Sequence, residues 1–147
     1  MGRYTTEREL IHPFVAWLAS NRRVGPGSVV VEELRWSGRK VDLATLTGAN
    51  RATAYEFKLN GTKRALEQAA YNGLAFDRSY VVTAVRPSET SLRMAAEVGV
   101  GVIVVERGGP RLIRPSPPSA IDPRIRRKLL RTIREASDVR CQVLPPA

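Results

Sequence analysis

The chain has 147 residues, a length typical of one domain, and 43% of them are hydrophobic, which is enough to bury a sizeable core. One cysteine excludes an intrachain disulfide and a two-cysteine zinc site, and one histidine leaves little for Ser-His or Cys-His catalysis. No apolar run approaches the roughly 18 residues of a membrane span, and the N-terminus lacks the apolar block of a signal peptide. We therefore expect a cytoplasmic protein with no membrane partner, and an enzyme of this composition would rely on carboxylates and lysines.

The formal net charge of +10 arises mainly near the C-terminus. Residues 107–147 hold 10 Lys and Arg against 3 Asp and Glu, whereas residues 1–106 hold 14 against 11. Arginine supplies 20 of the 24 cations, and its guanidinium makes forked contacts with phosphates. The excess indicates either a polyanionic partner, of which nucleic acid is the commonest, or a solubilising surface with an arginine preference.

The first half of the chain predicts a helix followed by three strands. The helix covers residues 6–20, where Thr6 and Glu9 have the spacing of a capping box and apolar residues recur at helical spacing. Short turns separate the strands that follow, so we expect an antiparallel meander. Its three strands lie at 29–36, 39–46 and 52–59.

The second half alternates helices and strands, which implies parallel crossover units. The predicted order is a helix at 63–76, a strand at 80–85, a helix at 87–98, a strand at 101–106, a short edge segment at 111–114 and a helix at 123–136. We therefore predict an α/β fold with a central mixed β-sheet flanked by helices. Residues 1–115 would form the domain proper, and residues 116–147 a proline-rich linker, a basic helix and a frayed tail.

The two strands at 39–46 and 52–59 contain the residues most suited to chemistry. Strand alternation places Glu56 and Lys58 on one face, opposite the apolar Tyr55 and Phe57, and Asp42 lies on the neighbouring strand. Two carboxylates on rigid strands can hold Mg²⁺, which prefers oxygen ligands. Such a metal lowers the pKa of a bound water and polarises a phosphoryl oxygen, and a lysine can orient that water or neutralise developing charge.

The segments Val41-Asp42-Leu43-Ala44 and Tyr55-Glu56-Phe57-Lys58 together resemble the signature of the PD-(D/E)XK nuclease superfamily, with 13 residues between the aspartate and the glutamate. The resemblance covers about residues 6–85, where the order of helix, meander, helix and strand is also similar. It implies a restriction-endonuclease-like core in which Asp42 and Glu56 bind Mg²⁺ or Mn²⁺. It also implies that the backbone carbonyl of Phe57 assists them and that Lys58 positions the water. Val41 stands where the family name has proline, a frequent departure.

Two further residues extend the resemblance. Glu7 shares the inward stripe of the first helix, and the resemblance to Holliday-junction resolvases makes it an additional metal ligand; alternatively it favours the helix dipole. Gln68 resembles the glutamine of the Gln-x-x-x-Tyr motif in RecB-type nucleases, where it approaches the metal site. Here Tyr71 follows at a spacing of three and Asn72 occupies the expected tyrosine position, so which of them contributes stays open. The alternative for Gln68 is an ordinary surface position.

Cations outside the core region are candidates for contact with nucleic acid. Lys63 and Arg64 begin the helix next to the proposed site and would touch phosphates or form a solvated face. The helix at 123–136 has one apolar stripe, which would dock onto the core or a second subunit, and its cations would contact a nucleic-acid backbone without reading sequence. These cations are Arg124, Arg127, Lys128 and Arg131. The alternative is a plain amphipathic terminal helix.

The combined prediction is a Mg²⁺- or Mn²⁺-dependent endonuclease that hydrolyses phosphodiester bonds in DNA, in repair, recombination or defence. Asp42, Glu56, Lys58 and Gln68 would form the catalytic set. A homodimer would supply two sites for two-strand cleavage. The rival prediction is a non-catalytic nucleic-acid-binding module on the same fold, and RNA stays open as a substrate.

Overall fold

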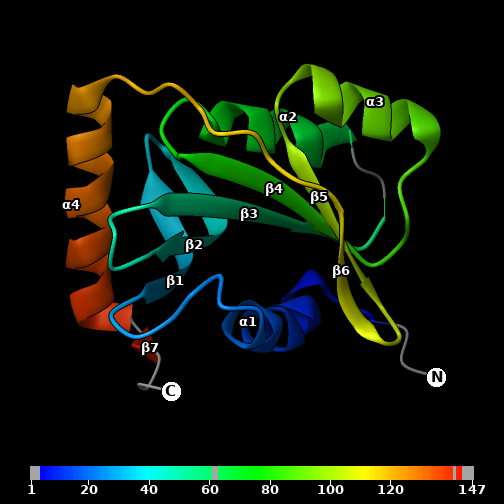
Figure 1. The fold of residues 1–147 in the computed structure, drawn as a ribbon, viewed down its shortest axis with the longest axis horizontal. Coiled ribbons are helices and arrows are strands. Elements are labelled where there is room, and N and C mark those ends of the chain that lie inside the picture. The colour runs from blue at the N-terminus through cyan, green and yellow to red at the C-terminus, as the bar shows by residue number, and fades with distance from the viewer. Residues whose placement is uncertain (1–3, 61–62, 141, 144–147) are drawn as a thin grey trace.

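The protein is built around one mixed β-sheet that carries helices on both faces (Figure 1). The structure is a computed structural model that describes residues 4–60, 63–140 and 142–143. The sheet has the strand order β6-β5-β4-β3-β2-β1-β7. Its strands are β1 (Val29–Trp36), β2 (Arg39–Leu46), β3 (Ala52–Lys58), β4 (Arg78–Thr83), β5 (Gly101–Glu106), β6 (Gly109–Arg114) and the two-residue β7 (Gln142–Val143). The helices are the 3₁₀ turn η1 (Glu7–Leu10), α1 (Ile11–Ser20), α2 (Lys63–Asn72), α3 (Glu89–Glu97) and α4 (Pro123–Arg140).

The connectivity confirms the predicted α/β class. Strands β1, β2 and β3 form the antiparallel meander, whereas β3, β4 and β5 pair in parallel through the crossover helices α2 and α3. Strand β6 returns antiparallel to β5 at the edge of the sheet. Among the described residues, no helix is long and apolar enough to cross a membrane.

Helix α1 covers one face of the sheet with the predicted apolar stripe. Leu10, Phe14 and Leu18 are fully buried, and the ring of Phe14 lies 4.9 Å from that of Tyr55 and 5.4 Å from that of Phe57. The helix does not run unbroken from residue 6, because its first turn is the 3₁₀ segment η1. The α-helical part begins at Ile11, which places Pro13 in a first turn where its missing N–H needs no partner.

The predicted capping box is wrong. The side chain of Thr6 makes no capping hydrogen bond to the helix backbone. The Glu9 carboxylate instead accepts hydrogen bonds from the hydroxyls of Thr5, at 2.6 Å, and Thr6, at 3.2 Å. These contacts tie the chain before η1 to its first turn through side chains.

Helix α2 is shorter than predicted, since it ends at Asn72 instead of residue 76. The chain turns at Gly73 and Leu74, and the N–H of Phe76 donates to the carbonyl of Asn72. As a result Leu74 is 64% exposed, while Phe76 is fully buried.

Helix α4 packs on the same chain, against the face of the sheet opposite α1. Leu129 and Ile133 are fully buried and join a core cluster with Val31, Ala44 and Phe76. The helix is longer than predicted and is followed by β7, which pairs with Val29 and Val30 of β1. The predicted frayed tail therefore contains helix and strand, although residues 141 and 144–147 lie outside the described part of the chain.

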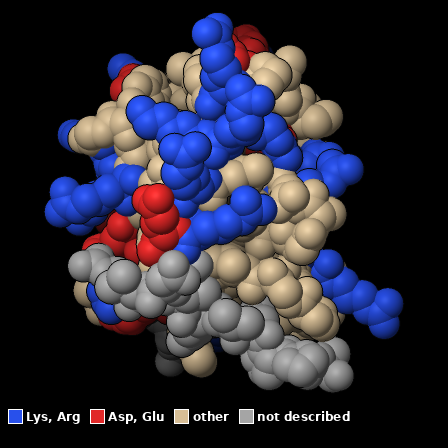
Figure 2. All heavy atoms as spheres, turned by 90° about the vertical axis from the view of Figure 1, so that its left-hand side faces the viewer, with Lys and Arg blue, Asp and Glu red and all other residues tan. Residues whose placement is uncertain are grey.

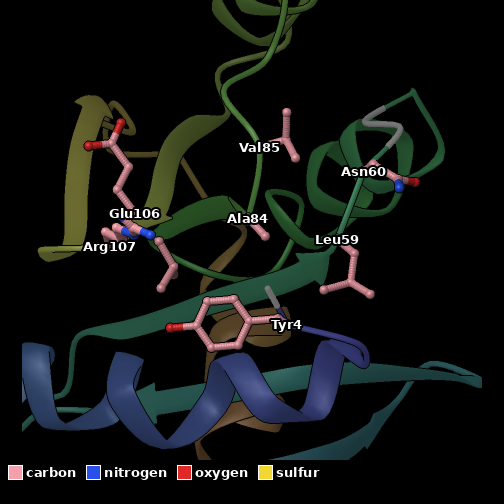
Figure 3. A pocket seen from close by; sticks show the side chains of 8 residues that line it. Tyr4, Leu59, Asn60, Ala84, Val85, Glu106 and Arg107 are labelled. Carbon is pink, nitrogen blue, oxygen red and sulfur yellow. The ribbon is translucent and has the colours of Figure 1, made fainter. Parts of the chain in front are cut away.

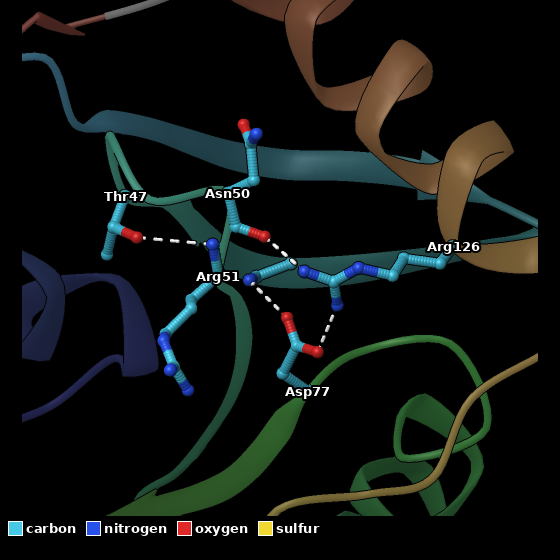
Figure 4. A network of polar contacts seen from close by, with 6 residues as sticks. Thr47, Asn50, Arg51, Asp77 and Arg126 are labelled. Atoms are coloured by element: carbon cyan, nitrogen blue, oxygen red, sulfur yellow. Dashed lines mark hydrogen bonds and ion pairs between the residues drawn. The ribbon is translucent and has the colours of Figure 1, made fainter. Parts of the chain in front are cut away.

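A polar network also joins α4 to the sheet (Figure 4). The guanidinium of Arg126 pairs with the carboxylate of Asp77 and donates to the carbonyl of Asn50. The other oxygen of Asp77 accepts from the N–H of Ala52 at 2.8 Å. One carboxylate before β4 thus links the start of β3 to the start of α4.

Leu129→Ala is expected to lower the free energy of unfolding by about 2–5 kcal/mol, because the side chain is fully buried and its removal leaves a cavity. Urea denaturation followed by circular dichroism measures the change. Ile125→Ala is the matched control on the same helix, and we expect a change below about 1 kcal/mol because this side chain is 40% exposed. Equal effects of the two variants would contradict the docking of α4 on the sheet.

Candidate active site

Strands β2 and β3 separate at the two predicted carboxylates. Their backbone pairing runs from Leu46 and Ala52 to Leu43 and Tyr55, and it stops there. The next residue on each strand is Asp42 or Glu56. The N–H of Phe57, which would continue the pairing, donates instead to Oδ2 of Asp42 at 2.9 Å. The end of the ladder therefore gives both carboxylates a place between two rigid strands.

The other neighbour of Asp42 is also irregular. Glu33 of β1 lies opposite Asp42, and its φ of 52° is in the left-handed region. Residues other than glycine adopt this region at a cost of about 1–2 kcal/mol. The registered pairs of β1 and β2 accordingly skip this position between Glu32–Leu43 and Leu34–Val41. Strained backbone of this kind is concentrated at functional sites in proteins.

Glu56 is a buried carboxyl group with a raised pKa. Only 3% of the residue is exposed, and the amide of Asn72 donates to its Oε1 at 3.2 Å. Burial first, and then the nearby charge of Asp42, raises the pKa of Glu56 to about 8. At neutral pH the pair therefore retains a proton, which a divalent cation between the two groups would displace.

The donor set around this pair suits a hard cation. In a strand the N–H and the C=O of one residue point to the same side, so the carbonyl of Phe57 faces Asp42 as its N–H does. The next carbonyl, that of Lys58, points the other way and accepts from the N–H of Ala84 on the β4 side. Two carboxylates and one backbone carbonyl are oxygen ligands of the kind that Mg²⁺ and Mn²⁺ take.

Lys58 and Glu7 meet at the end of β3. The Nζ of Lys58 lies 3.7 Å from Oε2 of Glu7, and both side chains are partly exposed. Glu7 therefore forms an ion pair with Lys58. No group of three His, Cys, Asp or Glu side chains suited to a metal is present in the described residues, so Glu7 does not converge with Asp42 and Glu56. Its role as a metal ligand stays a prediction.

Helix α2 places the amide of Asn72 against Glu56 and the amide of Gln68 in the groove beside Asp42. Asn72 is 4% exposed and contacts Glu56, whereas Gln68, one turn earlier, is half-buried and lines a groove together with Asp42. Tyr71 is 40% exposed, and its ring lies 4.3 Å beneath the guanidinium of Arg39. Of the two residues left open by the sequence, Asn72 is the one that contacts Glu56.

A groove of about 700 Å³ leads to Asp42 between the β1–β2 hairpin and α2. The hairpin supplies three cations to its wall, namely Arg35, Arg39 and Lys40. An adjoining depression contains Arg39 and Gln68 together with Lys63 and Arg64, so these two predicted cations do lie next to the site. The hairpin cations were missed, although their spacing around the Ser37-Gly38 turn is a usable signal for a basic loop.

Helix α4, which carries the four predicted cations, lies on the left-hand side in Figure 1, and Figure 2 shows that Lys and Arg side chains cover much of that side. Lys128 lines a third depression with Arg35 and Ser37 of the hairpin. Arg124, Arg127 and Arg131 are exposed and line none of these grooves. Their contact with nucleic acid stays a prediction.

A separate cavity of about 600 Å³ lies at the carboxyl ends of β3, β4 and β5 (Figure 3). Its lining is mostly apolar, and includes Tyr4, Leu59 and Val85. It contains one arginine, Arg107, and one glutamate, Glu106, which pairs with Arg111 at 3.7 Å. This balanced charge suits a polyanion less well than the groove at Asp42.

Comparison with known proteins supports the fold alone. No family model matches the chain, and no curated protein matches it. Among solved structures, the SPO1766 protein of unknown function from Silicibacter pomeroyi is similar, with a TM-score of 0.66 and 18% sequence identity. The similarity covers 90% of this chain and 87% of that one.

Proposed function

We propose that the protein is a Mg²⁺- or Mn²⁺-dependent nuclease of the PD-(D/E)XK type that hydrolyses phosphodiester bonds in DNA. The observation that carries the proposal is the pair Asp42 and Glu56, which lie next to each other where β2 and β3 separate, with Lys58 two residues further on. A buried carboxyl group next to a second carboxylate destabilises a fold unless a cation or a proton neutralises it. Such an arrangement is therefore a strong candidate for function.

The chain's own residues would divide the work as follows. Asp42, Glu56 and the carbonyl of Phe57 would hold the ion, and Asn72 orients Glu56 through its amide. A bound Mg²⁺ supplies a water of lowered pKa and polarises the phosphoryl oxygen. The ammonium of Lys58 would orient that water or balance the charge that develops at phosphorus, while Glu7 fixes the position of the ammonium.

Substrate binding would fall to the groove. Arg35, Arg39 and Lys40 on one wall, with Lys63 and Arg64 beside the other, present cations along the path to Asp42. Such contacts hold the phosphate backbone without reading its sequence. This supports nucleic acid as the class of substrate and assigns no sequence preference.

The test is incubation of the purified chain with plasmid, single-stranded DNA, a four-way junction and RNA. Each reaction is run with Mg²⁺, with Mn²⁺ or with EDTA. We expect cleavage only with metal, and a loss of at least about 100-fold in rate for both Asp42→Ala and Lys58→Ala. Glu32→Ala is the matched control, because its partner Leu43 belongs to the α1-side core and Glu32 therefore points away from the pair.

Equal activity in the wild type and in both variants would identify a contaminating nuclease and contradict the assignment. Binding of DNA without cleavage under every condition would instead favour a non-catalytic module.

A further inference from the structure

The third depression, between the β1–β2 hairpin, the end of α2 and α4, has a volume of about 380 Å³, within the usual range for small-ligand sites of roughly 300–1,000 Å³. We propose that it takes an unstacked nucleobase of the strand bound at the candidate active site. The substrate class would then be nucleic acid with an unpaired segment next to the scissile phosphate. This inference rests on the proposed function and specifies its substrate.

The depression gathers apolar side chains that folding leaves in water. Tyr71 and Ile125 are each 40% exposed and Leu74 is 64% exposed, so three of the six large exposed hydrophobic side chains in the described residues line this one surface. Tyr71 and Leu74 lie at the end of α2 and in the turn after it, and Ile125 comes from the distant helix α4. Trp36 of β1 completes the lining with an indole ring. A clustered apolar surface of this kind marks a binding site more often than chance exposure does.

The depression is continuous with the candidate active site. Arg35, Trp36 and Ser37 line both this depression and the groove that contains Asp42. Tyr71 lines both this depression and the one that contains Lys63 and Arg64. A strand held along the carboxylates would therefore reach the apolar surface without leaving the protein.

Charge selects a nucleobase over an apolar peptide as the occupant. The charged residues of the lining are Arg35 and Lys128, and no carboxylate lines the depression. Arg39 lies over the ring of Tyr71 at 4.3 Å and holds it in place. Aromatic and apolar walls flanked by cations are the combination that binds single strands, where bases stack and phosphates pair with arginine and lysine. A duplex keeps its bases stacked inside, so only an unpaired or extruded base would enter.

Tryptophan fluorescence tests this directly, because the chain has only two tryptophans, Trp17 and Trp36. The Trp17→Phe variant retains Trp36 as the sole indole, which lines the depression. This variant is titrated in EDTA, where no metal-dependent cleavage occurs, with oligothymidylate, with an abasic oligonucleotide of equal length and charge, and with a blunt duplex. We expect saturable quenching by oligothymidylate, and little quenching by the abasic strand or the duplex.

A second variant measures the contribution of the stacking surface. In the Trp17→Phe background, Tyr71→Ala is expected to weaken oligothymidylate binding by roughly 10-fold, as expected for loss of one stacking contact. Tyr71→Phe retains the ring and should bind as the parent does. Val98→Ala removes a side chain that is 50% exposed elsewhere, at the end of α3, and is the control for general surface changes.

Equal quenching by the abasic strand, or binding with no change in Trp36 emission, would overturn the inference. A depression at which no oligonucleotide changes Trp36 emission would instead be a surface for docking a protein. The two proposals fail separately. Base-dependent quenching in a protein that never cleaves would refute the nuclease alone. Metal-dependent cleavage without quenching would refute the base site alone.

Discussion

Replacement of Glu56 by glutamine is expected to abolish metal-dependent cleavage and at the same time to stabilise the fold at alkaline pH. The carboxyl group is 3% exposed, and burial together with the charge of Asp42 raises its pKa to about 8. The unfolded chain loses this proton near its ordinary pKa of 4.5, whereas the folded chain keeps it until about pH 8. Stability from this group is therefore fully present below about pH 4.5 and is lost as the pH rises to about 8.

Glutamine resembles the protonated acid, so the variant does not lose stability as the pH rises. Its amide oxygen can still accept from Asn72, and its NH₂ can donate to Asp42, as the shared proton does in the wild type. Urea denaturation at pH 6 and pH 9 measures the difference between variant and wild type. We expect the free energy of unfolding of Glu56→Gln to exceed that of the wild type by a few kcal/mol at pH 9.

Glu32→Gln is the matched control for this experiment, because it neutralises an exposed carboxylate on β1, a strand of the same sheet that does not pair with β3. It should change neither the stability profile nor cleavage. Retention of cleavage by Glu56→Gln, or a lower stability than the wild type at pH 9, would contradict the role given to the carboxyl pair.

The affinity for Mg²⁺ is expected to rise steeply with pH, by about 10-fold per unit well below pH 8 and by about 50-fold between pH 6 and pH 8. The cause is the proton on Glu56, whose pKa is raised to about 8 by burial and by Asp42. The ion must displace this proton in order to bind the pair. Isothermal titration calorimetry in two buffers of different ionisation enthalpy measures both the affinity and the number of protons released.

We expect close to one proton released per ion at pH 6 and fewer at pH 9. Asp42→Asn should bind the ion weakly at every pH, because one carboxylate is lost. An affinity that does not change between pH 6 and pH 8, without proton release, would show that the ion binds elsewhere.

The strands of the sheet were predictable because local patterns determine them. The bounds of β1, β2 and β5 agree with the prediction, since each strand is an apolar or alternating run closed by turn residues. The end of α2 was not predictable from the sequence, because its alanine-rich sequence continues a helical pattern past Asn72. There the burial of Phe76 against α4 decides where the chain turns, and such a long-range contact leaves no local signal. The same holds for β7, whose partner is β1.

The candidate site was likewise predictable from the sequence only in part. Strand alternation predicted Glu56 and Lys58 on one face with Asp42 on the neighbouring strand, and the structure does bring Asp42 next to Glu56, while Lys58 pairs with Glu7. The contact between Asn72 and Glu56 depends on how α2 crosses β3, which spacing alone left undecided between Tyr71 and Asn72. The hairpin cations were missed for a similar reason, because their approach to Asp42 follows from the packing of the hairpin beside α2.

The docking of α4 also has a consequence for the order of folding. Leu129 and Ile133 cover strands that precede them by about 100 residues, and contacts of such sequence separation form late. While the chain is being synthesised, Val31 and Ala44 stay uncovered until this helix has left the ribosome. The carboxyl pair lies on the same strand as Ala44 and on its neighbour, so we expect the pair to reach its final geometry only then. Helix α4 would thus delay any activity of the carboxyl pair until this face of the sheet is covered.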